Sequence, residues 1–215
     1  MIALANEKHL LLAEAMTIWH MPLYQKLWEI VKSGELGKVQ IITMNFGSFK
    51  EYDMKNRFFN MDLAGGAMLD IGVYALSIVR SFMDETPDDI VSQWKASPTG
   101  SDEQATILLK NGSGQMATVA LSMHSKQPKR AMISCEQGYI EIMEYPRAWE
   151  AKITYTDGRT ELVSAGENSD ALYYEITDME KAVNGDKNVM CLDYTADVME
   201  IMTRFRQEHG IIYPE

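Results

Sequence analysis

The chain has 215 residues, of which 46% are hydrophobic and 24% charged, enough for one large core or two small ones. Acidic residues outnumber basic ones by 31 to 20. This balance argues against nucleic acid or an anionic membrane as a partner, because both bind basic surfaces. No apolar run approaches the roughly 18 residues of a membrane span, and no signal-peptide pattern opens the chain.

The two cysteines, Cys135 and Cys191, stand outside any CxxC pair and away from ligand-spaced histidines. We therefore expect two buried thiols, a reducing cytoplasmic compartment and no metal site.

Helix and strand patterns alternate at the front of the chain. Residues 1–8 read as the end of a helix, and the apolar run 9–16 predicts a strand buried on both faces. Pro22 opens the next helix at its first turn, and a long alternating strand follows at 38–48. This order predicts an α/β unit.

The stretch GGAMLDIGVY (65–74) is the best candidate for chemistry. It follows a long loop, 49–64, and predicts an apolar helix that ends near Asp84. Asp70 and Tyr74 are four residues apart and would share one helix face. A carboxylate in an apolar helix is costly unless it is paired or faces a cleft. The structural alternatives are a loop-capping acid and a core tyrosine with one satisfied hydroxyl.

From residue 88 to 164 the chain predicts successive strands separated by turn signals such as Asn111-Gly112 and Asp157-Gly158. Such a meander forms an open, mostly antiparallel sheet. The predicted strands cover residues 89–97, 103–110, 115–123, 130–135, 138–143, 150–156 and 159–164.

The last 50 residues predict two helices, one from Ser169 or Asp170 to Val183 and one from about Asp193 to Glu208. The fold class is therefore α+β, an open, mostly antiparallel sheet backed by helices on one face. Apolar side chains of both parities in 103–110 and 115–123 predict a second subunit on the other face. The alternative is a twisted sheet with scattered exposed apolar residues.

Three motifs in fixed order, EAMTIWHMP (14–22), SGELGKV (33–39) and GGAMLDIGVY (65–74), resemble the Gfo/Idh/MocA family of oxidoreductases. The tyrosine form of the third motif is most similar to the dihydrodiol and sugar dehydrogenase branch. The family's GxGxxG loop and Glu-Lys-Pro motif are absent. The resemblance implies that 1–18 are the last helix and strand of a Rossmann-type nucleotide-binding domain, and that 19–215 are the substrate-binding and oligomerisation domain.

The family implies hydride transfer between NAD or NADP and a hydroxyl-bearing carbon of a sugar, polyol or diol. Tyr74 matches the position of the acid–base group, and Asp70 would bind substrate hydroxyls or orient that group. Because a free phenol titrates near pH 10, a cation should stand beside it, and the family's lysine is missing. We therefore expect this chain alone to be inactive and to bind no dinucleotide.

Further candidate substrate-binding residues are Trp19, His20 and Arg57. Trp19 and His20 follow a predicted strand, where α/β sheets place ligands, although the family often has arginine where Trp19 stands. His20 is either a second proton carrier or a structural residue, and Arg57 is either a ligand for substrate or cofactor or a surface ion-pair partner. The basic run 126–130 predicts a solvated loop.

Two rival functions remain open. One is a non-enzymatic ligand-binding or oligomerisation module. The other is hydrolysis by paired carboxylates, for which Asp70 lacks a partner acid in the sequence. A homodimer or tetramer through the sheet is expected in either case.

Overall fold

The computed structural model describes residues 1–186 and 188–214 and forms one eight-stranded sheet with helices. The strands are β1 (Val39–Gly47), β2 (Asp89–Ala96), β3 (Asp102–Lys110), β4 (Met116–Ser122), β5 (Gln127–Cys135), β6 (Gly138–Met143), β7 (Glu150–Tyr155) and β8 (Thr160–Ser164). The α-helices of the described residues are α1 (Ile2–Glu7), α2 (Pro22–Ser33), α3 (Val73–Phe82), α4 (Ala171–Val183) and α5 (Leu192–Glu208).

The strands lie in the order β2-β3-β4-β1-β5-β6-β7-β8. Every neighbouring pair is antiparallel except β1 and β4. A parallel pair needs a long connection, and α3, β2 and β3 supply it between these two strands. The predicted open, mostly antiparallel sheet is confirmed.

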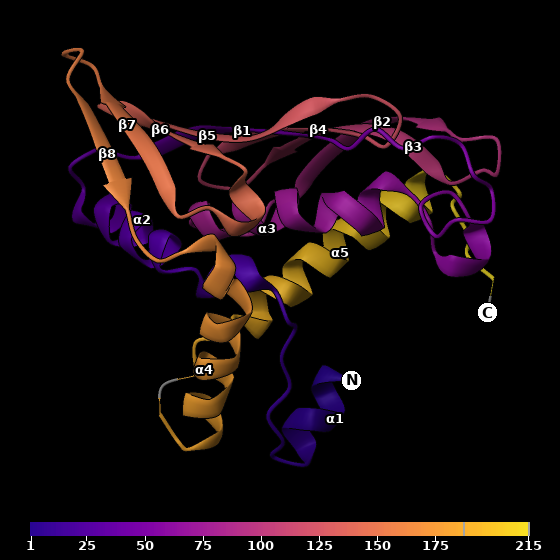
Figure 1. The fold of residues 1–215 in the computed structure, drawn as a ribbon, viewed down its shortest axis with the longest axis horizontal. Helices are drawn as coiled ribbons and strands as arrows, with labels where there is room; N and C mark the ends of the chain where they lie inside the picture. Colours follow the sequence, from indigo (N-terminus) through magenta and orange to yellow (C-terminus); the bar gives the residue numbers. More distant parts are fainter. Residues whose placement is uncertain (187, 215) are drawn as a thin grey trace.

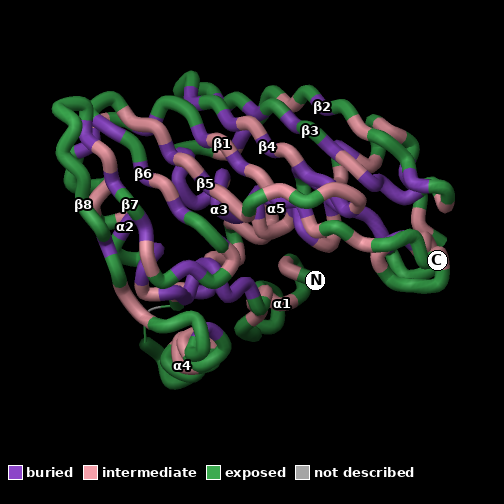
Figure 2. Tube along the Cα trace, turned by 45° about the horizontal axis from the view of Figure 1, so that its top comes forward, coloured by how far each residue is buried: buried purple, intermediate pink, exposed green. Residues whose placement is uncertain are grey.

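Helices cover one face of the sheet, as predicted: α2, α3 and α5 lie against it while the opposite face is bare (Figure 1). Alternation along the strands explains this arrangement, since Ile107 is fully buried and its neighbour Leu108 is 46% exposed. More and less buried residues alternate in a similar way along most of β4 and along β6 (Figure 2). Among the described residues, therefore, helices bury one face of the sheet and leave the other exposed.

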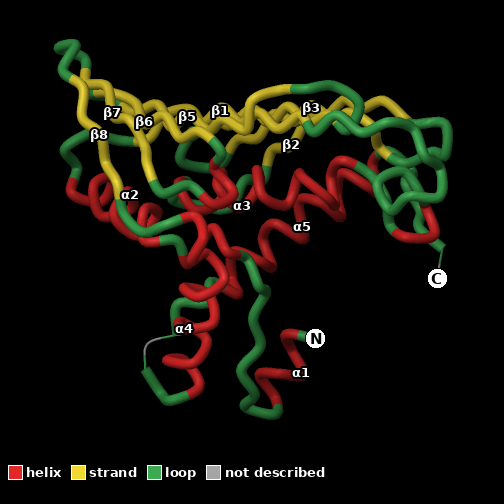
Figure 3. The backbone as a smooth tube through the Cα atoms, in the orientation of Figure 1, coloured by secondary structure: helices red, strands yellow, loops and turns green. Residues whose placement is uncertain are grey.

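The N-terminal segment departs from prediction. Helix α1 forms, but residues 10–16 are extended without strand pairing, and Leu10 is 65% exposed. A strand is stabilised by a hydrogen-bonded neighbour, and no described strand lies beside this segment. Together with α1 it projects away from the sheet on the same side as α4 (Figure 3). Oγ1 of Thr195, near the start of α5, donates to Oε2 of Glu14 at 2.8 Å.

One helical stretch, residues 61–82, is long and apolar enough by length and composition to cross a membrane, contrary to expectation. Of its most apolar window, 61% is buried inside the fold, which is typical of a core helix that packs under a sheet.

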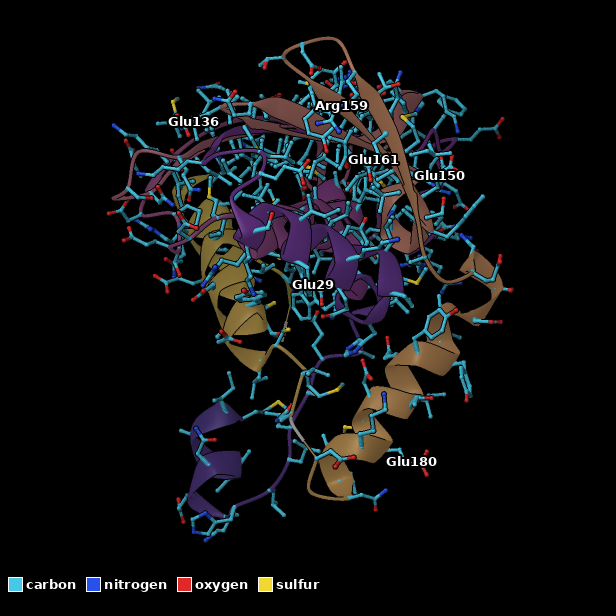
Figure 4. The ribbon with its side chains drawn as sticks, turned by 90° about the vertical axis from the view of Figure 1, so that its left-hand side faces the viewer. Glu29, Glu136, Glu150, Arg159, Glu161 and Glu180 are labelled. Atoms are coloured by element: carbon cyan, nitrogen blue, oxygen red, sulfur yellow. The ribbon has the colours of Figure 1, made fainter. Side chains whose placement is uncertain are left out.

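The acidic surplus is spread over many elements. Figure 4 labels glutamates on two helices, two strands and one turn, and the single labelled arginine, Arg159, lies over the Tyr155 ring at 3.7 Å. The labelled glutamates are Glu29, Glu136, Glu150, Glu161 and Glu180.

Both cysteines are free and half-buried. Burial raises the pKa of each of these thiols, Cys135 and Cys191, to about 11, so neither is an activated nucleophile.

Candidate active site

The helix that carries Asp70 and Tyr74 begins at two tightly packed glycines. A Cβ on Gly65 would lie 2.7 Å from the carbonyl oxygen of Arg57, and Gly66 has φ of 134°, which favours glycine. A π-helical turn, Met68–Gly72, then leads into α3. The predicted helix is thus present, but it opens with a wider turn of a kind often found at functional sites.

Asp70 is paired, as the cost of an unpaired acid predicts. Its Oδ1 lies 2.6 Å from Nη1 of Arg57, whose side chain is 64% exposed. The Arg57 guanidinium also lies over the Phe58 ring at 4.6 Å. Two of the candidate site residues therefore come together, one from the loop and one from the helix.

Tyr74 is half-buried and lines a hollow of about 280 Å³. Its ring lies 6.4 Å from the ring of Phe46, at the end of β1. The hollow combines an apolar wall with charged and amide groups. Its lining residues are Thr17, Phe46, Tyr74, Lys129, Glu144, Pro146, Arg147 and Asn168.

Lys129 places a cation in the hollow with Tyr74. Its Nζ donates to Oε2 of Glu144 at 2.9 Å and lies 5.4 Å from the centre of the Phe46 ring. The predicted solvated loop at 126–130 is wrong at this point, because β5 begins at Gln127. Lys129 has the same parity as buried Ala131 and Ile133, so it points toward the helix-covered face. Continuing the strand alternation two residues earlier would have found it.

Arg147 and Asn168 reach the hollow from segments far apart in the sequence. Arg147 lies in the short 3₁₀ turn Tyr145–Arg147, and its carbonyl oxygen accepts from Nδ2 of Asn168 at 3.0 Å. No sequence pattern marks either residue, because the fold alone brings these turns together.

Trp19 and His20 do not line the hollow. Both are buried in the 3₁₀ turn Thr17–His20. The Trp19 ring meets Tyr194 edge-on at 6.0 Å, and Nδ1 of His20 lies 3.0 Å from Oδ2 of Asp178. Their roles in substrate binding stay predictions. No group of three or more potential metal ligands occurs among residues 1–186 and 188–214.

Residues 24–141 match the family model of the GFO/IDH/MocA C-terminal domain, more than half of the chain. The chain belongs to the GFO/IDH/MocA family. This GFO/IDH/MocA chain is 25% identical over its whole length to trans-1,2-dihydrobenzene-1,2-diol dehydrogenase of Xenopus tropicalis, covering 67% of that relative. It is 26% identical over its whole length to scyllo-inositol 2-dehydrogenase (NADP(+)) of Bacillus subtilis (strain 168), again covering 67%.

Solved structures of two enzymes share the fold of this GFO/IDH/MocA chain. UDP-N-acetylglucosamine 3-dehydrogenase of Acidithiobacillus ferrooxidans gives a TM-score of 0.76 at 20% identity, over 98% of this chain and 64% of that one. A 3-ketoreductase from Actinomadura kijaniata, in complex with NADP and TDP-benzene, gives 0.77 at 18% identity, over 94% and 62%. The chain thus spans about two thirds of the length of the proteins it matches.

Proposed function

We propose that the whole protein is an NAD(P)-dependent oxidoreductase that transfers hydride between nicotinamide and a hydroxyl-bearing carbon of a sugar, polyol or diol. The observation that carries the proposal is Tyr74, a phenol in a hollow with polar walls, on the helix motif of a family whose named relatives are dehydrogenases. A hollow with a lysine, a glutamate and an amide suits a substrate with several hydroxyls, because each group can donate or accept a hydrogen bond.

In this proposal Tyr74 moves the hydroxyl proton of the substrate at its own Oη. Lys129 and Arg147 line the same hollow and supply hydrogen-bond donors for substrate hydroxyls. The Asp70–Arg57 pair, on the same helix and the loop before it, does not line this hollow, and its role toward substrate hydroxyls stays a prediction.

The residues of this chain do not fit a dinucleotide. The sequence has no GxGxxG or other phosphate loop after a strand. We therefore assign nicotinamide binding, and the hydride chemistry that the cofactor supplies, to a nucleotide-binding domain outside residues 19–215. The chain by itself is proposed to be inactive.

Calorimetric titration with NADH and NADPH tests this assignment. We expect no heat of binding with the 215-residue chain and micromolar binding with the protein that includes the nucleotide-binding domain. Tight binding to the chain alone would overturn the assignment, and no binding to either protein would overturn the proposed function.

The alternative function, an oligomerisation or ligand-binding module, is favoured by the bare outer face of the sheet. This face exposes one large apolar side chain from each of five strands, namely Ile41, Val91, Leu108, Met116 and Tyr139. We propose a homodimer or tetramer through this face for the oxidoreductase as well, so the dinucleotide titration separates the two functions. Free thiols support a reducing, cytoplasmic location.

A further inference from the structure

A buried carboxylate from β3 meets the start of the helix that carries the candidate site. Oδ2 of Asp102 accepts the backbone N–H of Met68 at 2.6 Å, and the side chain is almost entirely buried. Asp102 lies far from Tyr74 in sequence and does not line its hollow. Its carboxylate interacts with the site helix only at the first turn.

The fit between Asp102 and the helix start is close. A Cβ at Gly66 would collide with Oδ1 of Asp102, so the glycine leaves room for the carboxylate. Oδ1 has no hydrogen-bond partner among the described residues. Burial raises the pKa of Asp102 to about 7, although the backbone N–H groups of Met68 and Ala67 oppose the shift. A buried carboxylate with an unpaired oxygen lowers the free energy of unfolding. The backbone that this carboxylate contacts is the start of the site helix.

A second polar contact holds the same turn from the other end of the chain. The hydroxyl of Tyr213 donates to the carbonyl oxygen of Gly65 at 3.0 Å. Burial and nearby Asp102 raise the pKa of Tyr213 to about 12, so the hydroxyl keeps the proton that it donates. The turn at Gly65–Met68 is therefore fixed by side chains from β3 and from the C-terminal segment.

We propose that Asp102 and Tyr213 are positioning residues that fix the first turn of the site helix and thereby the place of the Tyr74 hydroxyl in its hollow. The expected effect on turnover rests on the proposed function. The claim that these two residues fix the first turn of the helix does not. A side chain on a helix moves with the helix start, and displacements of about 1 Å can lower turnover about 100-fold.

The first test uses the 215-residue chain and measures amide hydrogen exchange at Met68 by NMR. Asp102→Ala removes the acceptor and should speed exchange at Met68 about tenfold or more relative to the slowest core amides. Asp102→Asn keeps a carbonyl oxygen for the same N–H and should restore most of the protection. Unchanged exchange at Met68 in Asp102→Ala would overturn the inference.

The control is Asp197→Asn, on α5, which contacts the other end of the site helix through Arg80. Asp197 accepts from Nε of Arg80 at 2.6 Å and from Oγ1 of Thr86 at 2.7 Å. If Asp102 only stabilised the fold as a whole, Asp197→Asn would speed exchange at Met68 as much as Asp102→Ala does. Because we propose a local effect, Asp197→Asn should leave exchange at Met68 within about threefold. An equal effect of Asp197→Asn at Met68 would show a general loss of stability and count against positioning.

Tyr213→Phe keeps the test decisive if Asp102→Ala does not fold, because it removes only a hydroxyl. In the protein with its nucleotide-binding domain, Tyr213→Phe should lower kcat about three- to tenfold with KM within about twofold. An unchanged kcat would overturn the inference. If the unmodified protein itself shows no NAD(P)-dependent turnover, the proposed function fails while the exchange experiment still decides whether the turn is held.

Discussion

Nη1 of Arg57 lies 2.6 Å from Oδ1 of Asp70, which ties the loop before the site helix to the helix itself. The arginine is largely exposed and the carboxylate largely covered, and neither residue lines the hollow of Tyr74. An ion pair with one exposed partner contributes about 0–1 kcal/mol to the free energy of folding. We therefore expect the pair to matter more for ligand binding than for stability.

Removing the arginine tests this reading. Arg57→Ala should raise KM about tenfold, because Asp70 then loses the partner that orients it, while the free energy of unfolding falls by less than about 1 kcal/mol. Steady-state kinetics and urea unfolding measure the two effects. Lys55→Ala, an exposed change in the same loop, is the control. A large stability loss with unchanged KM would assign the pair a structural role.

Tyr74→Phe should lower kcat about 100-fold or more with KM changed by less than about threefold, because only the proton-moving hydroxyl is lost. The assay is NAD(P)H formation with sugar, polyol and diol substrates. Tyr173→Phe, at an exposed position on α4, is the matched control and should be neutral. Near-normal turnover in Tyr74→Phe would remove this residue from the catalytic role.

Lys129→Met tests the cation in the hollow. Methionine keeps an unbranched chain but removes the charged donor and leaves Glu144 without this partner, so kcat/KM should fall about tenfold. Lys152→Met, an exposed change on β7, should leave kcat/KM unchanged. An unchanged kcat/KM in Lys129→Met would leave Arg147 as the cation that matters in the hollow.

Asp102 makes stability depend on pH. Its pKa is about 7 in the fold against 3.8 in the unfolded chain, so between these pH values the folded state binds more protons. Stability contributed by this group is full below pH 4 and is lost as pH rises to 7, by about 3–4 kcal/mol in total. Asp102→Asn should flatten this slope, measured by urea unfolding from pH 4 to 8.

The groups that face Asp102 are not expected to produce the same slope. Burial raises the pKa of Tyr213 to about 12, which lies above this pH range. An Asp102→Asn variant with the full slope of the unmodified chain would contradict the assignment to Asp102.

Leu108→Glu tests the outer sheet face. The change places a carboxylate at the centre of the exposed apolar row and should convert a dimer to monomers, because an unpaired charge in an interface is strongly unfavourable. Light scattering after gel filtration measures the mass. Lys26→Glu, an exposed change on α2, should leave the mass unaltered. A chain that is already monomeric would contradict assembly through this face.

The strand pattern was largely readable from the sequence. Period-two alternation and turn residues placed β6 at 138–143, as observed, because hairpins depend on local interactions. The apolar run 9–16 predicts a strand that does not form, because an apolar run does not specify whether a neighbouring strand is present to pair with it. The start of β5 was also misjudged, because Pro128 and two basic residues obscured the alternation that brings Lys129 to the hollow.

The sequence by itself determined most of the elements, the sheet-and-helix class and the choice of Asp70 and Tyr74, because side-chain periodicity and motif spacing are local properties of the chain. Only the tertiary structure decided that Lys129, Glu144 and Arg147 share a hollow with Tyr74, and that Asp102 and Tyr213 hold its helix. These contacts join segments far apart in sequence, and their positions follow from how the strands and helices pack, which no local pattern specifies.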